Sequence, residues 1–335
     1  MPFGESFRTD SFAAMSFEPF VPLRIFSAYT MLDGAMEPKA IAKTAKDRGF
    51  PAIAVTDRNG LYAGMAFAEG CFDQGVQPII GTMLSVARPG QGDGADRGAP
   101  PVIDWLALYA QDETGYDNLC HLVSAAHLDR PVEHPPHVAL DALQGHCDGL
   151  IALTAGGEGA VTRLLAEEQS LTANLYLDTL ERLFGDRLYI ELCRRGMAVE
   201  IQAEQALIDL AYERELPLVA TNPACFADPG FHRAHDALTC IANGEYVTTE
   251  GREQSSPEAW IKSAPMMAER FADLPEAIAN TLVVARRCAV APPSRKPILP
   301  SLAGDLEGEV AQLRRDAHAG LEARLSLYTD LTEAD

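Results

Sequence analysis

The sequence predicts an α/β fold in which short buried strands alternate with helices around a mostly parallel sheet. From Phe20 onward, strand-like and helix-like segments alternate along the chain. The apolar run at 52–55 ends in the polar pair Thr56-Asp57, which is typical of a buried parallel strand with functional groups at its carboxyl end. Hydrophobic residues form 47% of the 335 residues, enough for a sizeable core. Repeated strand–helix units indicate a layered α/β architecture, but periodicity alone does not separate a closed barrel from an open sheet.

Each element has its own local signal. Ile41 and Ala45 lie one turn apart and predict a helix over 37–48. Gly75 is expected to end the helix at 64–74, because glycine readily takes the left-handed conformation found at helix C-termini. Gly, Pro and Asp predict surface connections at 88–101 and 128–148. The other expected strands are 76–80 (with 83–87 extending it or pairing beside it), 105–110, 150–153, 188–192 and 218–221, and the other expected helices are 115–126, one from about 159, 200–214, 229–242, 264–271, 274–288 and 307–327.

Charge narrows the classes of function. The chain has 27 Lys and Arg against 48 Asp and Glu, a formal net charge of -21. Nucleic acids are bound by basic surfaces, so we expect no DNA-binding surface on this chain. Basic residues are concentrated only at 293–296. No apolar run is long enough to span a membrane and no secretory h-region opens the chain, which predicts a cytoplasmic protein. The seven cysteines form no CxxC pair and are expected to be reduced thiols.

Several motifs could carry chemistry. The run Gly156-Gly157-Glu158-Gly159 between a strand and a helix could cradle a phosphate or form a tight turn. His232, His235 and Asp236 form the one compact metal-ligand cluster, since residues three apart share a helix face, or they form a solvated helix surface. Cys225 follows a strand without a nucleophile elbow, which favours a structural thiol.

Asp57-Arg58 is the best-placed pair, because ligand-binding groups of α/β folds gather at the carboxyl ends of strands. Asp57 could be a metal ligand or a general base. The alternative is an ion pair with Arg58 or Arg24.

The order of the motifs along the chain resembles the polymerase-and-histidinol-phosphatase (PHP) domain that opens bacterial DNA polymerase III alpha subunits. The resemblance runs from about residue 20 to 330. The matching segments are 20–34 (FVPLRIFSAYTMLDG), 52–59 (AIAVTDRN), 75–81 (GVQPIIG), 111–122 (QDETGYDNLCHL), 216–225 (LPLVATNPAC), 234–238 (AHDAL) and 271–288.

The resemblance implies a distorted (β/α)7 barrel followed by a helical C-terminal extension. It divides the chain into a leader at 1–19, a barrel domain at 20–290, and a Pro-rich linker with a helix at 291–335 that leads toward a polymerase palm. Active members of the family bind several metal ions through His, Asp, Glu and Cys at the strand ends.

Most of those ligands are replaced here, which implies a vestigial pocket without metal and without catalytic residues. Arg24 and Phe26 stand in the opening HxH, Arg58 replaces a histidine, and Met83, Trp105 and Gly156 stand at other ligand positions. A guanidinium pairs well with a carboxylate, so we expect Arg–Asp pairs to hold the pocket together. The pocket residues are expected to be Arg24, Asp33, Asp57, Arg58, Asn222 and Cys225.

The function implied is that of an N-terminal scaffold in the replicative polymerase, which docks the proofreading exonuclease and other replicase subunits. DNA contact and the catalytic Mg²⁺ would belong to palm regions that this sequence does not contain, so the chain alone is not expected to polymerise DNA. One alternative is a metal-dependent phosphoesterase or 3′-5′ exonuclease of the PHP family. Another is the error-prone paralogue of the polymerase.

Overall fold

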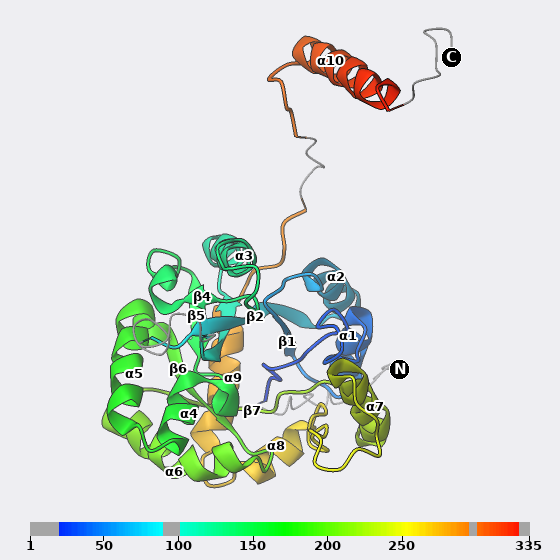
Figure 1. Cartoon of the computed structure of the whole chain (residues 1–335). Helices are drawn as coiled ribbons and strands as arrows, with labels where there is room; N and C mark the ends of the chain where they lie inside the picture. The colour runs from blue at the N-terminus through cyan, green and yellow to red at the C-terminus, as the bar shows by residue number, and fades with distance from the viewer. Residues whose placement is uncertain (1–19, 90–100, 295–299, 328–335) are drawn as a thin grey trace, which may run out of the picture. The chain divides into compact units, whose positions relative to one another are not determined.

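A curled α/β sheet surrounded by helices forms the main body of the chain in the computed structural model (Figure 1). The structure describes residues 20–89, 101–294 and 300–327. The expected leader at 1–19 lies outside these ranges. The chain divides into two compact units, Met1–Pro292 and Pro293–Asp335.

The sheet runs in the order β1-β2-β3-β5-β6-β7, and β4 pairs with β2. β3 is antiparallel to both of its neighbours, and the other pairs are parallel. The mostly parallel sheet expected from the sequence therefore contains one reversed strand. The strands are β1 (Ala52–Arg58), β2 (Gln77–Ala87), β3 (Ile103–Ala110), β4 (Val138–Ala139), β5 (Leu150–Leu153), β6 (Leu188–Cys193) and β7 (Leu218–Thr221).

Segment 22–26 joins the two ends of this sheet. On one side, Ala54 N donates to Pro22 O (2.9 Å) and Thr56 N donates to Ile25 O (2.8 Å). On the other side, Arg24 and Phe26 exchange backbone hydrogen bonds of 2.9 Å with Ala224, just beyond β7. The segment therefore stands between β1 and β7 and closes an irregular barrel, as the resemblance implied.

The helices of the first unit cover the outside of the sheet, as the alternation of elements predicted (Figure 1). Gly75 takes a φ of 70° at the end of α2, so the expected stop signal is confirmed. The helix expected from about 159 is two helices, because the chain turns at Glu168, where φ is 59°. The helices are α1 (Pro38–Asp47), α2 (Gly64–Gln74), α3 (Glu113–Leu128), α4 (Ala160–Ala166), α5 (Ser170–Phe184), α6 (Ala198–Glu213), α7 (His232–Asn243), α8 (Ala264–Arg270) and α9 (Pro275–Arg287) in the first unit, and α10 (Leu306–Leu325) in the second.

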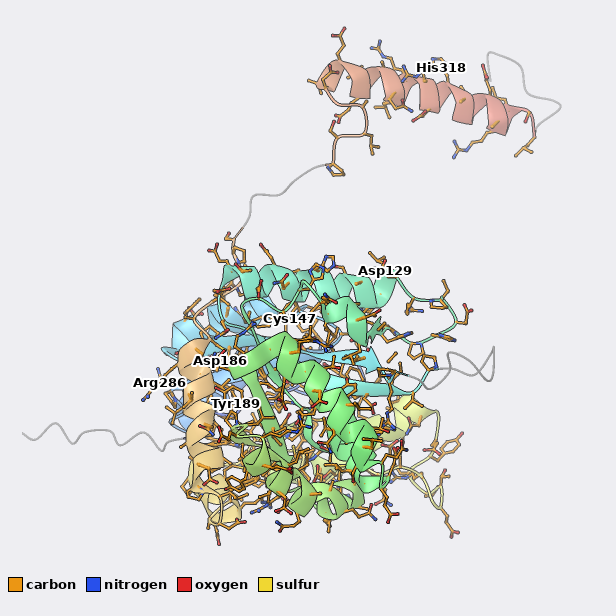
Figure 2. All side chains as sticks on the ribbon, turned by 90° about the vertical axis from the view of Figure 1, so that its left-hand side faces the viewer. Asp129, Cys147, Asp186, Tyr189, Arg286 and His318 are labelled. Carbon is orange, nitrogen blue, oxygen red and sulfur yellow. The ribbon has the colours of Figure 1, made fainter. Side chains whose placement is uncertain are left out.

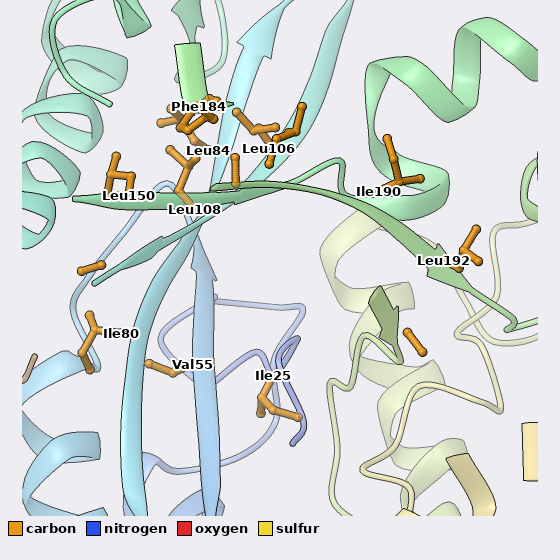
Figure 3. Packing of buried hydrophobic residues seen from close by; sticks show 14 of the residues in the cluster. Ile25, Val55, Ile80, Leu84, Leu106, Leu108, Leu150, Phe184, Ile190 and Leu192 are labelled. Carbon is orange, nitrogen blue, oxygen red and sulfur yellow. The ribbon is translucent and has the colours of Figure 1, made fainter. Parts of the chain in front are cut away.

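Both faces of the sheet are buried, and alternate residues of each strand enter different cores. In β1, Ile53 and Val55 pack toward the helices, whereas Ala52 and Ala54 belong to a second cluster inside the barrel. Figure 3 shows the outer cluster, where Leu84, Leu108 and other branched side chains meet. Two buried faces explain why the strands read as continuous apolar runs.

Charged side chains fix α9 against the barrel at the end opposite the strand carboxyl termini. Arg287 of α9 donates to Asp186 Oδ2 (3.0 Å) and to the Tyr189 hydroxyl (3.2 Å). Asp186 and Tyr189 are labelled beside this helix in Figure 2.

None of the helices in the described ranges combines the length and hydropathy needed to cross a membrane.

Candidate functional site

Charged side chains from several strand ends meet at the carboxyl edge of the barrel. Arg58 ends β1, Arg24 lies in segment 22–26, and Glu191 lies within β6. Glu158 lies in the turn between β5 and α4. Because the carboxyl ends of neighbouring strands converge, residues far apart in sequence become neighbours here.

Arg24 is the largest fully buried side chain described, with an exposed fraction of 0%. One of its terminal nitrogens donates to both carboxylate oxygens of Glu191, at 2.8 and 2.9 Å. The other donates to Glu158 Oε2 at 2.8 Å. Burial opposes the charge, but Glu191 and Glu158 outweigh it and raise the pKa of Arg24, so the guanidinium stays cationic.

Arg58 forms the second cation of the site. Its Nε donates to Asp33 Oδ2 (2.7 Å), and a terminal nitrogen donates to Glu158 Oε1 (2.6 Å). The guanidinium carbon lies 4.8 Å from the Phe26 ring centroid and 4.5 Å from that of Trp105. Two aromatic faces and two carboxylates therefore hold Arg58 in one orientation.

Glu158 links the two arginines, because each of its oxygens accepts from a different guanidinium. Burial alone would raise the pKa of this carboxyl. Arg58 and Arg24 outweigh that effect and hold the pKa at about 2. The Glu158 carboxylate is therefore ionised throughout the physiological pH range.

Asp57 has a different environment, and the expected ion pair with Arg58 or Arg24 is wrong. Its carboxylate accepts from the backbone N and the hydroxyl of Ser27, both at 2.7 Å, and from the Thr30 hydroxyl at 2.8 Å. Burial raises the pKa of Asp57, although the hydrogen bonds from Ser27 and Thr30 oppose this shift. The Arg–Asp pairing predicted from the sequence holds for Arg58 and Asp33 only. Arg24 pairs with glutamates because segment 22–26 directs it toward β5 and β6.

Asp33, Cys225 and His235 form a candidate metal-binding group, with one potential ligand atom of each within 4.8 Å of the others. The Cys225 thiol donates to Asp33 Oδ1 (3.3 Å). His235 Nε2 donates to the backbone oxygen of Asp33 (2.6 Å), which leaves Nδ1 of a neutral ring to accept from the Ser255 hydroxyl (2.5 Å). Burial, and then the charge of Asp33, raise the pKa of Cys225 well above its ordinary value.

These three residues fit at most one ion. A metal would have to take Asp33 from both Arg58 and the Cys225 thiol, deprotonate that thiol, and free a ring nitrogen of His235. The cationic Arg58 beside Asp33 opposes each of these changes. A multi-metal cluster does not fit the site, because Arg24 and Arg58 already occupy Glu158 and Glu191.

Asn222 does not join the charged cluster. Its side-chain nitrogen donates to the backbone oxygens of Glu258 (3.0 Å) and Trp260 (2.9 Å). The structure thus brings together Arg24, Asp33, Arg58 and Cys225, places Asp57 beside them, and turns Asn222 toward another loop.

The expected pocket did not include Glu158, Glu191 or His235. His235 was named only in a separate candidate cluster with His232 and Asp236, whereas the structure groups it with Asp33 and Cys225. The sequence contained an indication for Glu191, because it is an acidic residue in the middle of an apolar strand. In the structure its exposed fraction is 0%. Glu158 lies in the Gly-rich run, which proves to be a tight turn rather than an open cradle: a Cβ on Gly159 would lie 1.7 Å from Thr154 O. His235 is buried, so the helix surface expected around it is not solvated there.

Comparison with known proteins finds the same family that the motifs suggested. The PHP domain profile matches residues 22–195. DNA polymerase III subunit alpha of Caulobacter vibrioides is 42% identical over 311 residues, which are 92% of this chain and 27% of that protein. The Escherichia coli K12 subunit of the same name is 34% identical over 322 residues, 95% of this chain and 27% of the relative. This chain therefore spans about a quarter of the length of these relatives.

Solved structures align with part of this chain. A Bifidobacterium adolescentis protein described as a metal-dependent phosphoesterase aligns with a TM-score of 0.43 and 13% identity. The alignment covers 75% of this chain and 96% of that protein.

Proposed function

The chain belongs to the PHP domain family, as a homologue of the N-terminal PHP region of DNA polymerase III subunit alpha, and we propose that it is a scaffold without chemistry of its own. The observation that carries the proposal is Glu158 held between Arg24 and Arg58. Fixed guanidinium charges satisfy the buried carboxylates, so the barrel can be stable without metal ions.

The test is elemental analysis of the purified chain together with a phosphoesterase assay. We expect less than one transition metal per chain and no phosphate release with Mn²⁺ or Zn²⁺. Stoichiometric tightly bound metal, with hydrolysis that Asp57→Asn abolishes, would refute the scaffold proposal.

The second candidate is a residual metal-dependent phosphoesterase, and it rests on Asp33, Cys225 and His235. If it were correct, Cys225→Ser would lower zinc affinity while leaving the free energy of unfolding of the metal-free chain nearly unchanged. The thiol–carboxylate contact and the His235 contacts favour the scaffold over this candidate.

As partners we propose the proofreading exonuclease and other subunits of the replicase, in the cytoplasm, with DNA synthesis and its Mg²⁺ supplied elsewhere in the polymerase. The net charge of -21 suits protein contacts better than DNA contacts. Pulldown of the exonuclease subunit by the folded chain tests this partner, and failure to retain it would argue against the assignment.

A further inference from the structure

The sequence contains the dipeptide Asn-Gly twice, at Asn59-Gly60 and at Asn243-Gly244. This dipeptide is chemically unstable in water, because the glycine nitrogen can attack the asparagine side-chain carbonyl and close a five-membered ring. Glycine permits the attack because it has no Cβ to obstruct the approach and its backbone rotates freely. The attack requires a mobile side-chain amide, so the surroundings of each dipeptide decide whether it reacts.

Asn59 is fixed in the core, just beyond the end of β1. It is 7% exposed, and its Nδ2 donates to Ser85 Oγ (2.8 Å) and to Pro136 O (3.3 Å). Its Oδ1 accepts from Ser85 N (2.9 Å). Turning the side-chain amide toward Gly60 N would break these hydrogen bonds inside the protein, at a cost that solvent does not repay. The structure therefore protects this dipeptide.

Asn243 has the opposite surroundings. It is exposed at the last position of α7, and Gly244 follows it with a φ of 67°. Within the described residues, the Asn243 side chain has no hydrogen-bond partner. Apart from its two chain neighbours, no atom lies within 4 Å of the position that a Cβ on Gly244 would take. Nothing in the described part of the chain therefore holds the Asn243 amide away from Gly244 N.

The glycine nitrogen does not distinguish the two dipeptides. Gly60 N donates to Thr82 Oγ1 over 3.3 Å. Gly244 N donates to Ile241 O over the same distance. Both hydrogen bonds are longer than the usual value of about 2.9 Å, so neither holds its nitrogen firmly. The difference between the dipeptides therefore lies in the asparagine.

The backbone also favours reaction at Asn243. The attack requires the asparagine to leave its native φ and ψ angles, and the last turn of a helix frays at little cost in free energy. Asn59 N, in contrast, donates to Met83 O (2.8 Å) on β2. A comparable movement of Asn59 would disrupt the edge of the buried sheet.

We propose that Asn243 is a site of spontaneous deamidation in the folded chain and that Asn59 is not. Gly244 N bonds to Cγ of Asn243, the bond from Cγ to the side-chain nitrogen breaks, and ammonia leaves with the proton that Gly244 N gives up to the solvent. Water then adds to either carbonyl carbon of the ring and opens it to aspartate or isoaspartate. Water is the one co-reactant, and the inference does not depend on the scaffold function proposed above.

The new carboxylate should loosen the end of α7. A negative charge at a helix C-terminus is unfavourable because of the helix dipole, and Glu245 is close to it in sequence. Isoaspartate also adds a methylene group to the main chain, which displaces Glu245 N from Cys240 O (2.9 Å at present). The segment that follows α7 therefore loses the contact that fixes its start.

The far end of this segment has independent anchors. Arg252 Nη1 donates to Asp236 Oδ1 (2.8 Å). His235 contacts the Ser255 hydroxyl through Nδ1 and the Asp33 carbonyl of loop 27–34 through Nε2. Deamidation leaves these contacts in place, so we expect the loosening to stay within residues 241–251.

Peptide mapping by mass spectrometry tests the proposal on the full chain, kept folded in mildly alkaline buffer for days to weeks. The peptide with Asn243 should gain one dalton and yield both aspartate and isoaspartate, whereas the peptide with Asn59 should stay unchanged. The rate at Asn243 should be higher by about tenfold or more, because Asn59 must first open buried hydrogen bonds. In urea the two rates should become similar, since the dipeptide is the same and the fold is absent.

Two variants identify the cause. Asn243→Gln should abolish the mass gain, because the longer side chain would have to close a larger ring. Ser85→Ala should raise the rate at Asn59 and leave the rate at Asn243 unchanged, because it removes the hydroxyl that accepts from Asn59 Nδ2. Thermal unfolding establishes that each variant is folded before incubation, and the urea series replaces Ser85→Ala if that variant does not fold.

An unmodified Asn243 after a period that converts the urea-unfolded chain would overturn the proposal. Equal or faster conversion of Asn59 in the folded chain would overturn it as well. Anion exchange separates the deamidated fraction, which carries one more negative charge. Hydrogen exchange in this fraction should be faster at 241–251 and unchanged in β1 and β2, and unchanged exchange at 241–251 would contradict the expected loosening.

Discussion

Two carboxylates at the barrel mouth, Glu158 and Asp57, have pKa values that are shifted in opposite directions. Glu158 accepts from two guanidinium groups, and its pKa falls to about 2. Asp57 accepts from an amide and two hydroxyls, and burial raises its pKa. Burial therefore does not decide the charge state of a site by itself; the partners that the fold supplies decide it.

The surroundings of Glu158 and of Asp57, called here the two sides of the site, also stabilise different parts of the structure. The Glu158 side ties strand ends of the barrel together through Arg24, Glu191 and Arg58. The Asp57 side shapes loop 27–34 and its exposed apolar residues. Changes on the first side should affect global stability, and changes on the second should affect local order.

The largest expected effect is from Arg24→Met. Removing one partner of a buried ion pair leaves Glu191 and part of Glu158 without a counter-charge, so the free energy of unfolding should fall by about 3–5 kcal/mol. Urea unfolding followed by tryptophan fluorescence measures the change. Arg182→Met, at an exposed position on α5, is the control.

A double variant sharpens this result. Arg24→Met with Glu191→Gln should lose less stability than the sum of the two single changes, because removing both charges leaves fewer unpaired groups. A loss below about 1 kcal/mol for Arg24→Met alone would show that the arginine does not hold the barrel together.

Asp57→Asn should have a smaller and more local effect. The asparagine nitrogen that replaces Oδ2 cannot accept from the Ser27 hydroxyl, so about 1–3 kcal/mol should be lost. Hydrogen exchange should quicken in loop 27–34 more than in the strands. Asp47→Asn on exposed α1 is the matched control. Exchange that quickens equally across the barrel would remove the distinction between the two sides.

The two carboxylates should make the free energy of unfolding depend on pH in opposite directions. The lowered pKa of Glu158 stabilises the fold above its ordinary value of 4.5, and this contribution is lost as the pH falls toward about 2. The raised pKa of Asp57 has the reverse sign, so stability rises as the pH falls through the folded value toward 3.8.

Unfolding curves at several pH values test these signs. The stability difference between wild type and Glu158→Gln should shrink below pH 4.5, by at most about 1.4 kcal/mol per pH unit. The difference between wild type and Asp57→Asn should grow as the solution is acidified. Parallel slopes for the two variants would contradict the assigned environments.

The smallest expected effect is from a chelator. If guanidinium groups satisfy Glu158 and the amide and hydroxyl donors of Ser27 and Thr30 satisfy Asp57, EDTA should leave the thermal midpoint unchanged, because there is no bound ion to lose. Added Zn²⁺ with and without Cys225→Ser is the control for the second candidate function. A chelator-induced fall of several degrees in the wild-type chain would favour a metal centre.

Much of the fold follows from local pattern. Buried strands such as 52–55 and the helix stop at Gly75 are visible because apolar periodicity and glycine conformation are properties of neighbouring residues. The reversal of β3 and the closure by segment 22–26 are not visible, because strand direction and pairing depend on residues far apart in the chain.

The candidate site shows the same limit. Arg24, Asp33, Arg58 and Cys225 could be named from motif positions, and the structure brings them together. The partners of these side chains could not be predicted. Asp57 was expected beside an arginine, but it accepts hydrogen bonds from Ser27 and Thr30. Glu158 was considered only as part of the Gly-rich turn, but it accepts from Arg24 and Arg58. A side chain's partner depends on where other strands place their donors, which local spacing does not specify.

By itself, the sequence determined the alternation of strands and helices, the acidic balance of the chain, and the presence of Arg24 and Arg58 in the motifs that resemble the PHP family. Only the tertiary structure decided which carboxylate meets which cation, and that His235 ties loop 27–34 to the segment after α7. The reason is physical: composition and periodicity act over a few residues, whereas the charge state and the partners of a buried group depend on every strand that reaches the barrel mouth.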